Sequence, residues 1–239
     1  MWEIKKREFK IQKMTLNIKN VEYVFASNEM KNYVIEKYNV NKKNAYVCIN
    51  GGLPLELNNK LDKDKLLPQK GKLNFVYAGT LNKGRQIEKL IKIFKKLENK
   101  ELNLILLGEG GEWLKSLSKN IVYLGNLPEV DAQRIVSLCD VGIVPYDSER
   151  FYYNLCYPTK NSFYITSGIP LLITPLKESM NVLFKESVLF VKKIEEWESF
   201  IEKLSVFEVE LKKVKVKEIW KNYEWNFLIE KLFKEMRLL

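Results

Sequence analysis

A lysine near the start of a short predicted helix is the first feature of this sequence that could do chemistry. Residues 156–175 are CYPTKNSFYITSGIPLLITP. The fixed φ of Pro158 suits helix entry, and we expect Thr159 to accept hydrogen bonds from free N–H groups in the first turn. Gly168 is expected to end the helix, since glycine adopts positive φ without strain. A helix N-terminus beside Lys160 favours negative charge, so this stretch predicts an anion site.

Composition limits the other chemistry that the chain could perform. The 239 residues contain no histidine, which excludes histidine-based triads, histidine metal sites and histidine general bases. The three cysteines (48, 139 and 156) are scattered without a metal or redox spacing, which is typical of reduced cysteines in a cytosolic protein. We therefore expect no metal site.

Length and composition favour a folded globular domain with a hydrophobic core. Apolar residues make up 46% of the chain, which is enough for a core and argues against disorder. At ~100–200 residues per domain, the length predicts one large domain or one domain with additional pieces. No apolar run is long enough to span a membrane, and the charged start MWEIKKREFK is unlike a secretion signal.

The formal net charge of +10 raises the question of an anionic partner. Nucleic acid or an anionic membrane surface would suit such a charge. However, only five of the 40 basic residues are arginine, and the lysines lie on predicted exposed helix faces such as KKLENK. A solvated surface is therefore favoured. Nucleic-acid binding depends on charge alone and is not expected, whereas peripheral association with an anionic membrane stays open.

Alternating apolar strands and amphipathic helices begin at Leu73. Strands are predicted at 73–79, 102–108, 120–125, 140–146, 171–173 and 188–191. Helices are predicted at 84–97, 112–117, 129–139, 160–167 and 195–204. Repeated strand–helix units with continuous apolar strands indicate a doubly wound parallel sheet covered on both faces. Ligands in such sheets bind at the carboxyl ends of the strands, which here carry Gly79, Gly108, Gly125 and Pro145-Tyr146.

Weaker patterns flank this region. A charged lead-in covers residues 1–20, and a strand (21–27), a helix (28–40) and a second strand (45–49) follow it. Residues 53–71 lack a clear period and are interpreted as a linker. The tail, 221–239, predicts an amphipathic helix whose narrow apolar stripe favours packing on the domain over membrane association.

Four segments in a fixed order carry a family resemblance. They are YAGTLNKGRQIEKLI, LILLGEGGEW, IVYLGNLPEVDAQRIVSLCDVGIVPY and YPTKNSFYITSGIPLL. Together they resemble the C-terminal half of a GT-B glycosyltransferase of the broad family-four type. The form P-x-K-x-S-x-Y-x-x-x-G-x-P in the last segment is most similar to the galactofuranosyltransferase-like and glucosyltransferase branches of bacterial glycan synthesis.

The resemblance runs from about Val21 to the tail and implies a domain plan. It divides the chain into a remnant of an acceptor-side N-terminal domain (1–52), a linker (53–72), a Rossmann-like nucleotide-sugar domain (73–205) and a C-terminal segment whose helix crosses back (206–239). YVCINGG and YEW resemble the segments that leave and re-enter the acceptor domain. The larger part of that domain has no counterpart before Val21.

The resemblance also implies a set of residues that bind the donor diphosphate. Gly79 and Thr80 would let the backbone approach the phosphates. Lys83, Arg85 and Lys160 would supply positive charge, and the fork of an arginine matches phosphate geometry. The three cations also have purely structural alternatives. Lys83 would be a turn lysine, Arg85 a helix-capping arginine and Lys160 a surface lysine.

The segment Gly125-Asn126-Leu127 resembles the one that borders the nucleotide base, and a departure from the family affects the ribose. The broad family has two glutamates eight residues apart, whereas this chain has Leu155 and Phe163 at those places. Ribose contacts are then expected from one or more of three other residues: Ser162, Tyr164 and Glu149.

Two hypotheses follow from the resemblance. The chain is the donor-binding half of a nucleotide-sugar-dependent glycosyltransferase in glycan or polysaccharide biosynthesis, completed by a separate N-terminal GT-B domain. Alternatively, it is a non-catalytic fragment or degenerate subunit that binds a nucleotide sugar. The implied donor is UDP-linked by family frequency, the implied acceptor is a glycan or lipid-linked saccharide, and the location is cytoplasmic or at the membrane periphery. No cofactor is implied, and no catalytic residue is identified.

Overall fold

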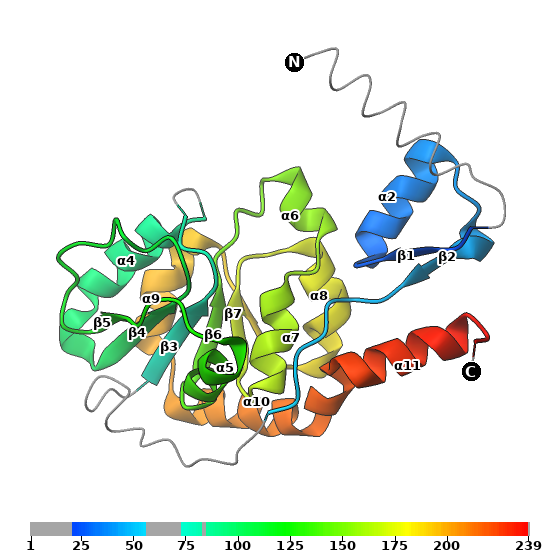
Figure 1. Ribbon diagram of the computed structural model, residues 1–239. Coiled ribbons are helices and arrows are strands. Elements are labelled where there is room, and N and C mark those ends of the chain that lie inside the picture. Colours follow the sequence, from blue (N-terminus) through cyan, green and yellow to red (C-terminus); the bar gives the residue numbers. More distant parts are fainter. Residues whose placement is uncertain (1–20, 56–72, 83–84, 239) are drawn as a thin grey trace, which may run out of the picture.

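The computed structural model describes residues 21–55, 73–82 and 85–238, and its main feature is a six-stranded parallel sheet (Figure 1). In the order β5-β4-β3-β6-β7-β8, every neighbouring pair is parallel. The strands are β3 (Leu73–Ala78), β4 (Leu102–Leu107), β5 (Ile121–Tyr123), β6 (Val141–Val144), β7 (Leu171–Ile173) and β8 (Leu189–Val191). The predicted α/β fold with a doubly wound parallel sheet is confirmed.

Helices cover both faces of this sheet. The α-helices that follow β3 in the chain are α4 (Ile87–Lys96), α5 (Glu129–Ser137), α6 (Phe151–Leu155), α7 (Thr159–Thr166), α8 (Lys177–Leu183), α9 (Trp197–Lys203), α10 (Val206–Ile219) and α11 (Trp225–Glu235). Successive residues of a strand point to opposite faces, so β3 contributes Phe75 and Tyr77 to one core and Val76 to the other. The first core includes α4 and α9, and the second includes α5, α7 and α10.

Helix α7, which carries the candidate lysine, begins and ends close to the predicted residues. It follows Pro158, and Gly168 lies just beyond its end with φ +85°. The predicted cap was wrong in one respect, because Pro158 occupies the N-cap position and no side-chain hydrogen bond caps the helix. Thr159 is already the first helical residue. A capping side chain belongs to the residue before the helix, where it accepts a hydrogen bond from an N–H group of the first turn.

The predicted helix at 112–117 is also wrong, since turns occupy this segment. The indole N–H of Trp113 donates a hydrogen bond to the carbonyl of Leu81 at 2.8 Å, and the Trp113 side chain packs against the core. A segment this short gains little from helix propagation, so the tertiary contact decides its conformation.

The N-terminal part of the described chain forms a small separate unit. Strands β1 (Tyr23–Phe25) and β2 (Ala45–Val47) pair in parallel, and α2 (Asn28–Tyr38) connects them. The hydroxyl of Ser27 caps α2 by accepting a hydrogen bond from the amide of Met30 at 3.1 Å. The predicted lead-in at 1–20 and most of the linker lie outside the described residues.

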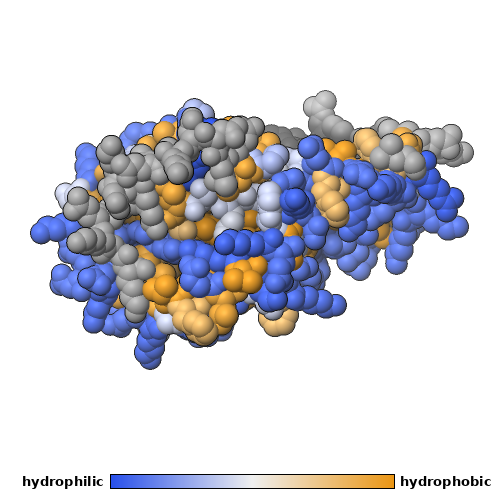
Figure 2. Space-filling view, turned by 90° about the horizontal axis from the view of Figure 1, so that it is seen from below, coloured by the Kyte–Doolittle hydropathy of each residue, from blue (hydrophilic) through white to orange (hydrophobic). Residues whose placement is uncertain are grey.

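Two C-terminal helices connect the sheet domain with this small unit. Val209 and Val216 of α10 are buried in the cores of the sheet domain. Helix α11 then extends away from the sheet domain and contacts β2 (Figure 1). The face along which α10 runs is mainly hydrophilic, with separated hydrophobic patches (Figure 2). None of the helices in the described ranges is both long and apolar enough to cross a membrane.

Candidate functional site

Two glycines form the floor of the candidate site at the carboxyl ends of β3 and β4. Gly79 and Gly108 have φ values of +136° and +130°, which side chains rarely tolerate. A Cβ atom on Gly79 would lie 2.3 Å from the Nζ atom of Lys160, and one on Gly108 would lie 2.2 Å from the carbonyl oxygen of Gly79. The bare backbone of Gly79 therefore leaves room for the ammonium group of Lys160 directly over the end of β3.

Lys160 is buried in the first turn of α7, with 7% of the residue exposed. Its ammonium group donates a hydrogen bond to the hydroxyl of Tyr146 at 3.0 Å and lies 5.0 Å from the centre of the Tyr77 ring. Within the described part of the chain, no carboxylate forms an ion pair with it. A buried cation without an anionic partner is costly, so this position suits an anionic ligand.

Arg85 contacts the same tyrosine as Lys160. Its guanidinium group is 5.9 Å from the centre of the Tyr146 ring, and Nη1 is 3.4 Å from the Tyr146 hydroxyl. Burial opposes the charged form, but the phenol groups of Tyr146 and Tyr77 outweigh it and raise the pKa of Arg85. Arg85 and Lys160 thus converge on one tyrosine, and together they provide two positive charges at the strand ends.

A cavity of about 250 Å³ opens at these strand ends, between the starts of α5 and α7. Of the predicted donor-binding residues, Gly79, Asn126, Leu127 and Lys160 line it. Its remaining lining residues are Gly51, Ala78, Leu107, Gly108, Glu129, Ala132, Thr159 and Phe163. The cavity therefore combines a cation, a glycine backbone and the start of the loop after β5.

A second cavity of about 270 Å³ adjoins the first, and Thr159 lines both. Tyrosines dominate its wall together with Arg85, while Ala26, Met30 and Asn50 contribute from the N-terminal side. The four tyrosines are 146, 152, 153 and 157. The rings of Tyr146 and Tyr153 stack with their centres 4.7 Å apart. This cavity therefore offers flat aromatic surfaces next to the cationic end of the first.

Two of the residues predicted for the ribose lie away from both cavities. The Tyr164 hydroxyl accepts a hydrogen bond from the amide of Ala78 at 2.9 Å, and the ring packs where Gly142 leaves space. The Ser162 hydroxyl is buried 3.2 Å from the hydroxyl of Tyr157. Both side chains belong to the protein interior, which corrects the expectation that they contact the nucleotide.

The other predicted residues have varied positions. Glu149 is exposed on the loop before α6 and lines neither cavity. Gly125 has φ +77°, and a Cβ atom added to it would meet no other atom within 4 Å, so its role is in the turn itself. Thr80 is half-buried, with its hydroxyl 3.5 Å from a carboxylate oxygen of Glu109. Lys83 lies outside the described residues.

Eight lining residues of the first cavity were not among the predicted site residues, and three of them add distinct features. Gly51 lies against Trp225, since a Cβ atom on it would be 2.8 Å from the indole ring. Phe163 and Glu129 contribute one apolar and one acidic side chain. The Asn-Gly-Gly turn at 50–52 and the acidic residue after Leu127-Pro128 were the available signals, but neither indicates on its own that the residue faces a ligand.

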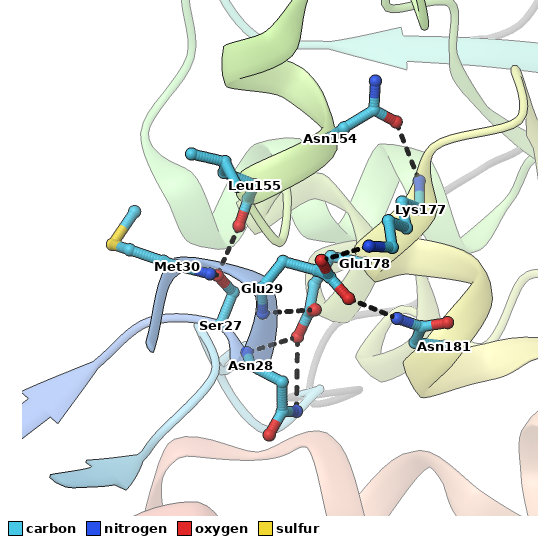
Figure 3. Close-up of polar contacts among 9 residues, drawn as sticks. All are labelled: Ser27, Asn28, Glu29, Met30, Asn154, Leu155, Lys177, Glu178 and Asn181. Carbon is cyan, nitrogen blue, oxygen red and sulfur yellow. Dashed lines mark hydrogen bonds and ion pairs between the residues drawn. The ribbon is translucent and has the colours of Figure 1, made fainter. Parts of the chain in front are cut away.

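A polar joint holds the N-terminal unit against the sheet domain beside the second cavity (Figure 3). The carboxylate of Glu178 in α8 is fully buried and accepts hydrogen bonds from the amides of Asn28 and Glu29 at 2.7 and 3.0 Å. The hydroxyl of Ser27 also donates a hydrogen bond to the carbonyl of Leu155. These contacts place the start of α2 next to α6 and α8.

Glu29 adds a second set of contacts to this joint. Its carboxylate is 2.6 Å from the ammonium group of Lys177 and accepts a hydrogen bond from Asn181 at 3.0 Å (Figure 3). Because a negative carboxylate and a helix N-terminus attract each other, Glu178 and the start of α2 are electrostatically matched. The joint fixes where Ala26 and Met30 lie in the wall of the second cavity.

Comparisons with known proteins agree with this architecture. The family model described as "Glycosyl transferases group 1" matches residues 58–213. No curated protein matches the sequence. Among solved structures, a glycosyltransferase from Rickettsia africae ESF-5 has a TM-score of 0.71 at 12% identity, over 95% of this chain and 67% of that one.

Two further solved structures share the fold. The Anabaena protein Alr3699/HepE in complex with UDP has a TM-score of 0.70 at 13% identity, over 91% of this chain and 64% of that one. The sucrose-phosphate synthase of Thermosynechococcus elongatus has a TM-score of 0.69 at 11% identity, over 98% and 61%. This chain therefore spans about two thirds of the length of these structures.

Proposed function

The chain belongs to the glycosyl transferases group 1 family, and we propose that it supplies the nucleotide-sugar-binding half of a GT-B glycosyltransferase. The observation that carries this proposal is the buried ammonium group of Lys160, which lies beside the bare backbone of Gly79 and has no carboxylate partner among the described residues. A diphosphate would supply the missing negative charge.

The proposed chemistry uses this charge when the glycosidic bond breaks. Negative charge grows on the diphosphate as it leaves, and cations that are already in place stabilise it without reorganisation. Lys160 and Arg85, which both contact the Tyr146 hydroxyl, would bind the phosphates, and Lys83 would assist them. The backbone at Gly79 and Thr80 would approach the phosphates closely, as only a glycine turn allows.

The two cavities suggest how the donor lies. The nucleoside would occupy the first cavity, with its base against the loop at Gly125, Asn126 and Leu127. The sugar would extend past Lys160 toward the tyrosine-lined second cavity. We propose a UDP-linked donor, and the UDP and UDP-glucose complexes of the Anabaena structure support it by analogy of fold.

The acceptor would be bound largely by another domain. On the N-terminal side of the second cavity, the described part of the chain provides only a small unit, residues 21–55. The similar solved structures are about half as long again as this chain. We propose that a separate or preceding N-terminal GT-B domain holds a glycan or lipid-linked acceptor. Sugar transfer would take place in the cytoplasm, at the periphery of an anionic membrane, as a step in polysaccharide biosynthesis.

A non-catalytic donor-binding subunit is the second candidate. Leu155 and Phe163 stand where the broad family has glutamates, and the chain has no histidine that could act as a base. Both candidates require the same binding site. They differ in whether sugar transfer appears when an N-terminal GT-B domain is supplied.

Calorimetry with nucleoside diphosphates tests the shared part of the proposal. We expect the full chain to bind one of them, and Arg85→Ala and Lys160→Ala each to lower its affinity tenfold or more, because a charge-assisted hydrogen bond is worth about 1.5–3 kcal/mol. Lys185→Ala, which removes an exposed lysine outside both cavities, is the matched control. Unchanged affinity in both site variants would place the site elsewhere.

A further inference from the structure

The first cavity presents contrasting walls to a bound nucleoside. Helix α7 contributes the apolar ring of Phe163, and α5 contributes Ala132 and Glu129. The ribose of a nucleotide carries two adjacent hydroxyl groups, and burying them without hydrogen-bond acceptors would be costly. The hydroxyl of Ser162 and the phenol of Tyr164 are turned into the interior and cannot serve as partners. On the α5 side, Glu129 offers a charged acceptor.

Glu129 is the one carboxylate among the described residues that line this cavity. It is the first residue of α5, directly after Pro128, and Ala132 lies one turn further along the same face. Both line the cavity, so this face of α5 points into it. The glutamate therefore stands at the rim, opposite the α7 wall, with a side chain long enough to reach inward.

The carboxylate of Glu129 is also uncommitted within the described part of the chain. No hydrogen bond or ion pair joins it to another described residue, whereas Asp131 on the same helix pairs with Arg134 at 3.2 Å. An ionised carboxylate offers two oxygens that accept hydrogen bonds and no donor. Two adjacent ribose hydroxyls, each a donor, complement this pair of acceptors.

We propose that Glu129 recognises the ribose of the donor by accepting hydrogen bonds from its 2′ and 3′ hydroxyls. The proposal depends on the proposed nucleotide-binding function and names the residue that selects a ribonucleotide. Carboxylates bind ribose hydroxyls in this way in other Rossmann-like sites. Here the carboxylate comes from the helix after β5, and α7 contributes apolar contact through Phe163.

Paired nucleotides test this assignment with the full chain. The affinities of UDP and GDP are compared with those of their 2′-deoxy counterparts by calorimetry, for the wild type, Glu129→Ala and Asp131→Ala. The wild type should bind the ribonucleotide about tenfold or more tightly than the deoxynucleotide, as expected for a hydrogen bond to a charged group. Glu129→Ala should lower ribonucleotide affinity by a similar factor and bring the two affinities together.

Asp131→Ala is the matched control, since it removes an acidic side chain from the first turn of the same helix without touching the cavity. It should keep the ribose preference of the wild type. A wild type that binds both sugars equally, or a Glu129→Ala variant that still discriminates, would overturn the assignment while leaving nucleotide binding intact. Failure of the wild type to bind any nucleotide would overturn both proposals.

Discussion

The carboxylate of Glu178 accepts a hydrogen bond from the amide of Asn28 at 2.7 Å, although 150 positions separate the two residues in the chain. Glu178 is fully buried in α8, and its second oxygen accepts from the amide of Glu29. One side chain thus satisfies two of the free N–H groups at the start of α2. The small N-terminal unit is held to the sheet domain by a specific contact.

Glu178→Ala should loosen this unit. Losing a buried carboxylate that binds two amides should cost about 1.5–3 kcal/mol or more, because both donors are left without partners. Hydrogen exchange should quicken at the α2 amides, and chemical unfolding should report the lower stability. Lys177→Ala is the control, since it breaks only the partly exposed ion pair to Glu29 and should change the stability little. Unchanged exchange in Glu178→Ala would contradict the role of the joint.

Lys160→Met should separate binding from stability. The variant replaces a buried cation with an apolar chain of similar length, so the free energy of unfolding without ligand should stay the same or rise. Nucleoside diphosphate affinity should fall tenfold or more. Thermal unfolding and calorimetry on the same sample measure the two quantities. A destabilised variant with normal affinity would mean that Lys160 serves the fold instead.

Gly108→Ala should be far more damaging than Gly125→Ala. Both residues have positive φ, and that strain alone should cost about 1–3 kcal/mol. Only at Gly108 would the added Cβ also overlap a backbone carbonyl, that of Gly79, at 2.2 Å. We expect a loss of more than about 4 kcal/mol there. Urea unfolding compares the two variants, and equal losses would show that the close approach of β3 and β4 is not required.

The ion pair between Lys213 of α10 and Asp140 should make the stability of the protein fall at alkaline pH. Burial lowers the pKa of Lys213, but Asp140, whose carboxylate is 2.7 Å from the ammonium group, outweighs this effect and raises it above 10.5. Since the pKa is higher in the folded state, the contribution to stability is complete below pH 10.5 and is lost as the pH rises through the folded value.

Lys213→Arg provides the comparison, because arginine keeps its charge throughout this range. Unfolding free energies of the two proteins should run in parallel up to about pH 10.5 and diverge above it, with the wild type falling more steeply. Parallel curves over the whole range would mean that the ion pair adds nothing to stability.

The chain alone should not transfer sugar. Positioning an acceptor hydroxyl against the anomeric carbon can be worth ~7–11 kcal/mol of the barrier, and the groups that would do so are proposed to lie in another domain. Labelled nucleotide sugars and saccharide or lipid acceptors, with and without a candidate N-terminal domain, test this. Robust transfer by the 239 residues alone would show that they build the acceptor site, and the half-enzyme proposal would then have to be dropped.

The sheet and the glycine turns were predictable because their signals are local. Continuous apolar runs that end in glycine predicted β3 and β4, and Gly79 and Gly108 lie directly after these strands with positive φ. The end of α7 at Gly168 followed from the freedom of glycine at positive φ. These features depend on a few neighbouring residues, and periodicity captures them.

The faces of α7 were not predictable in the same way. Six of its eight residues are buried, on all sides of the helix, so no polar stripe marks which side chains reach the cavity. Lys160 reaches it, while Ser162 and Tyr164 face the interior. Glu129 was missed for a related reason, because an acidic residue at the start of a helix is common and gains a role only from the cavity beside it.

The hydrogen bond between Tyr164 and Ala78 has a thermodynamic consequence for ligand binding. The Tyr164 hydroxyl accepts a hydrogen bond from the last residue of β3 and donates one to Ile143 of β6, so α7 is tied to β3 and to its neighbour β6. The ammonium group of Lys160 and the bare backbone of Gly79 are thereby placed before any ligand arrives. Binding of a diphosphate then costs the protein little conformational entropy. Its affinity is set mainly by the contacts that Lys160 and Gly79 make with it.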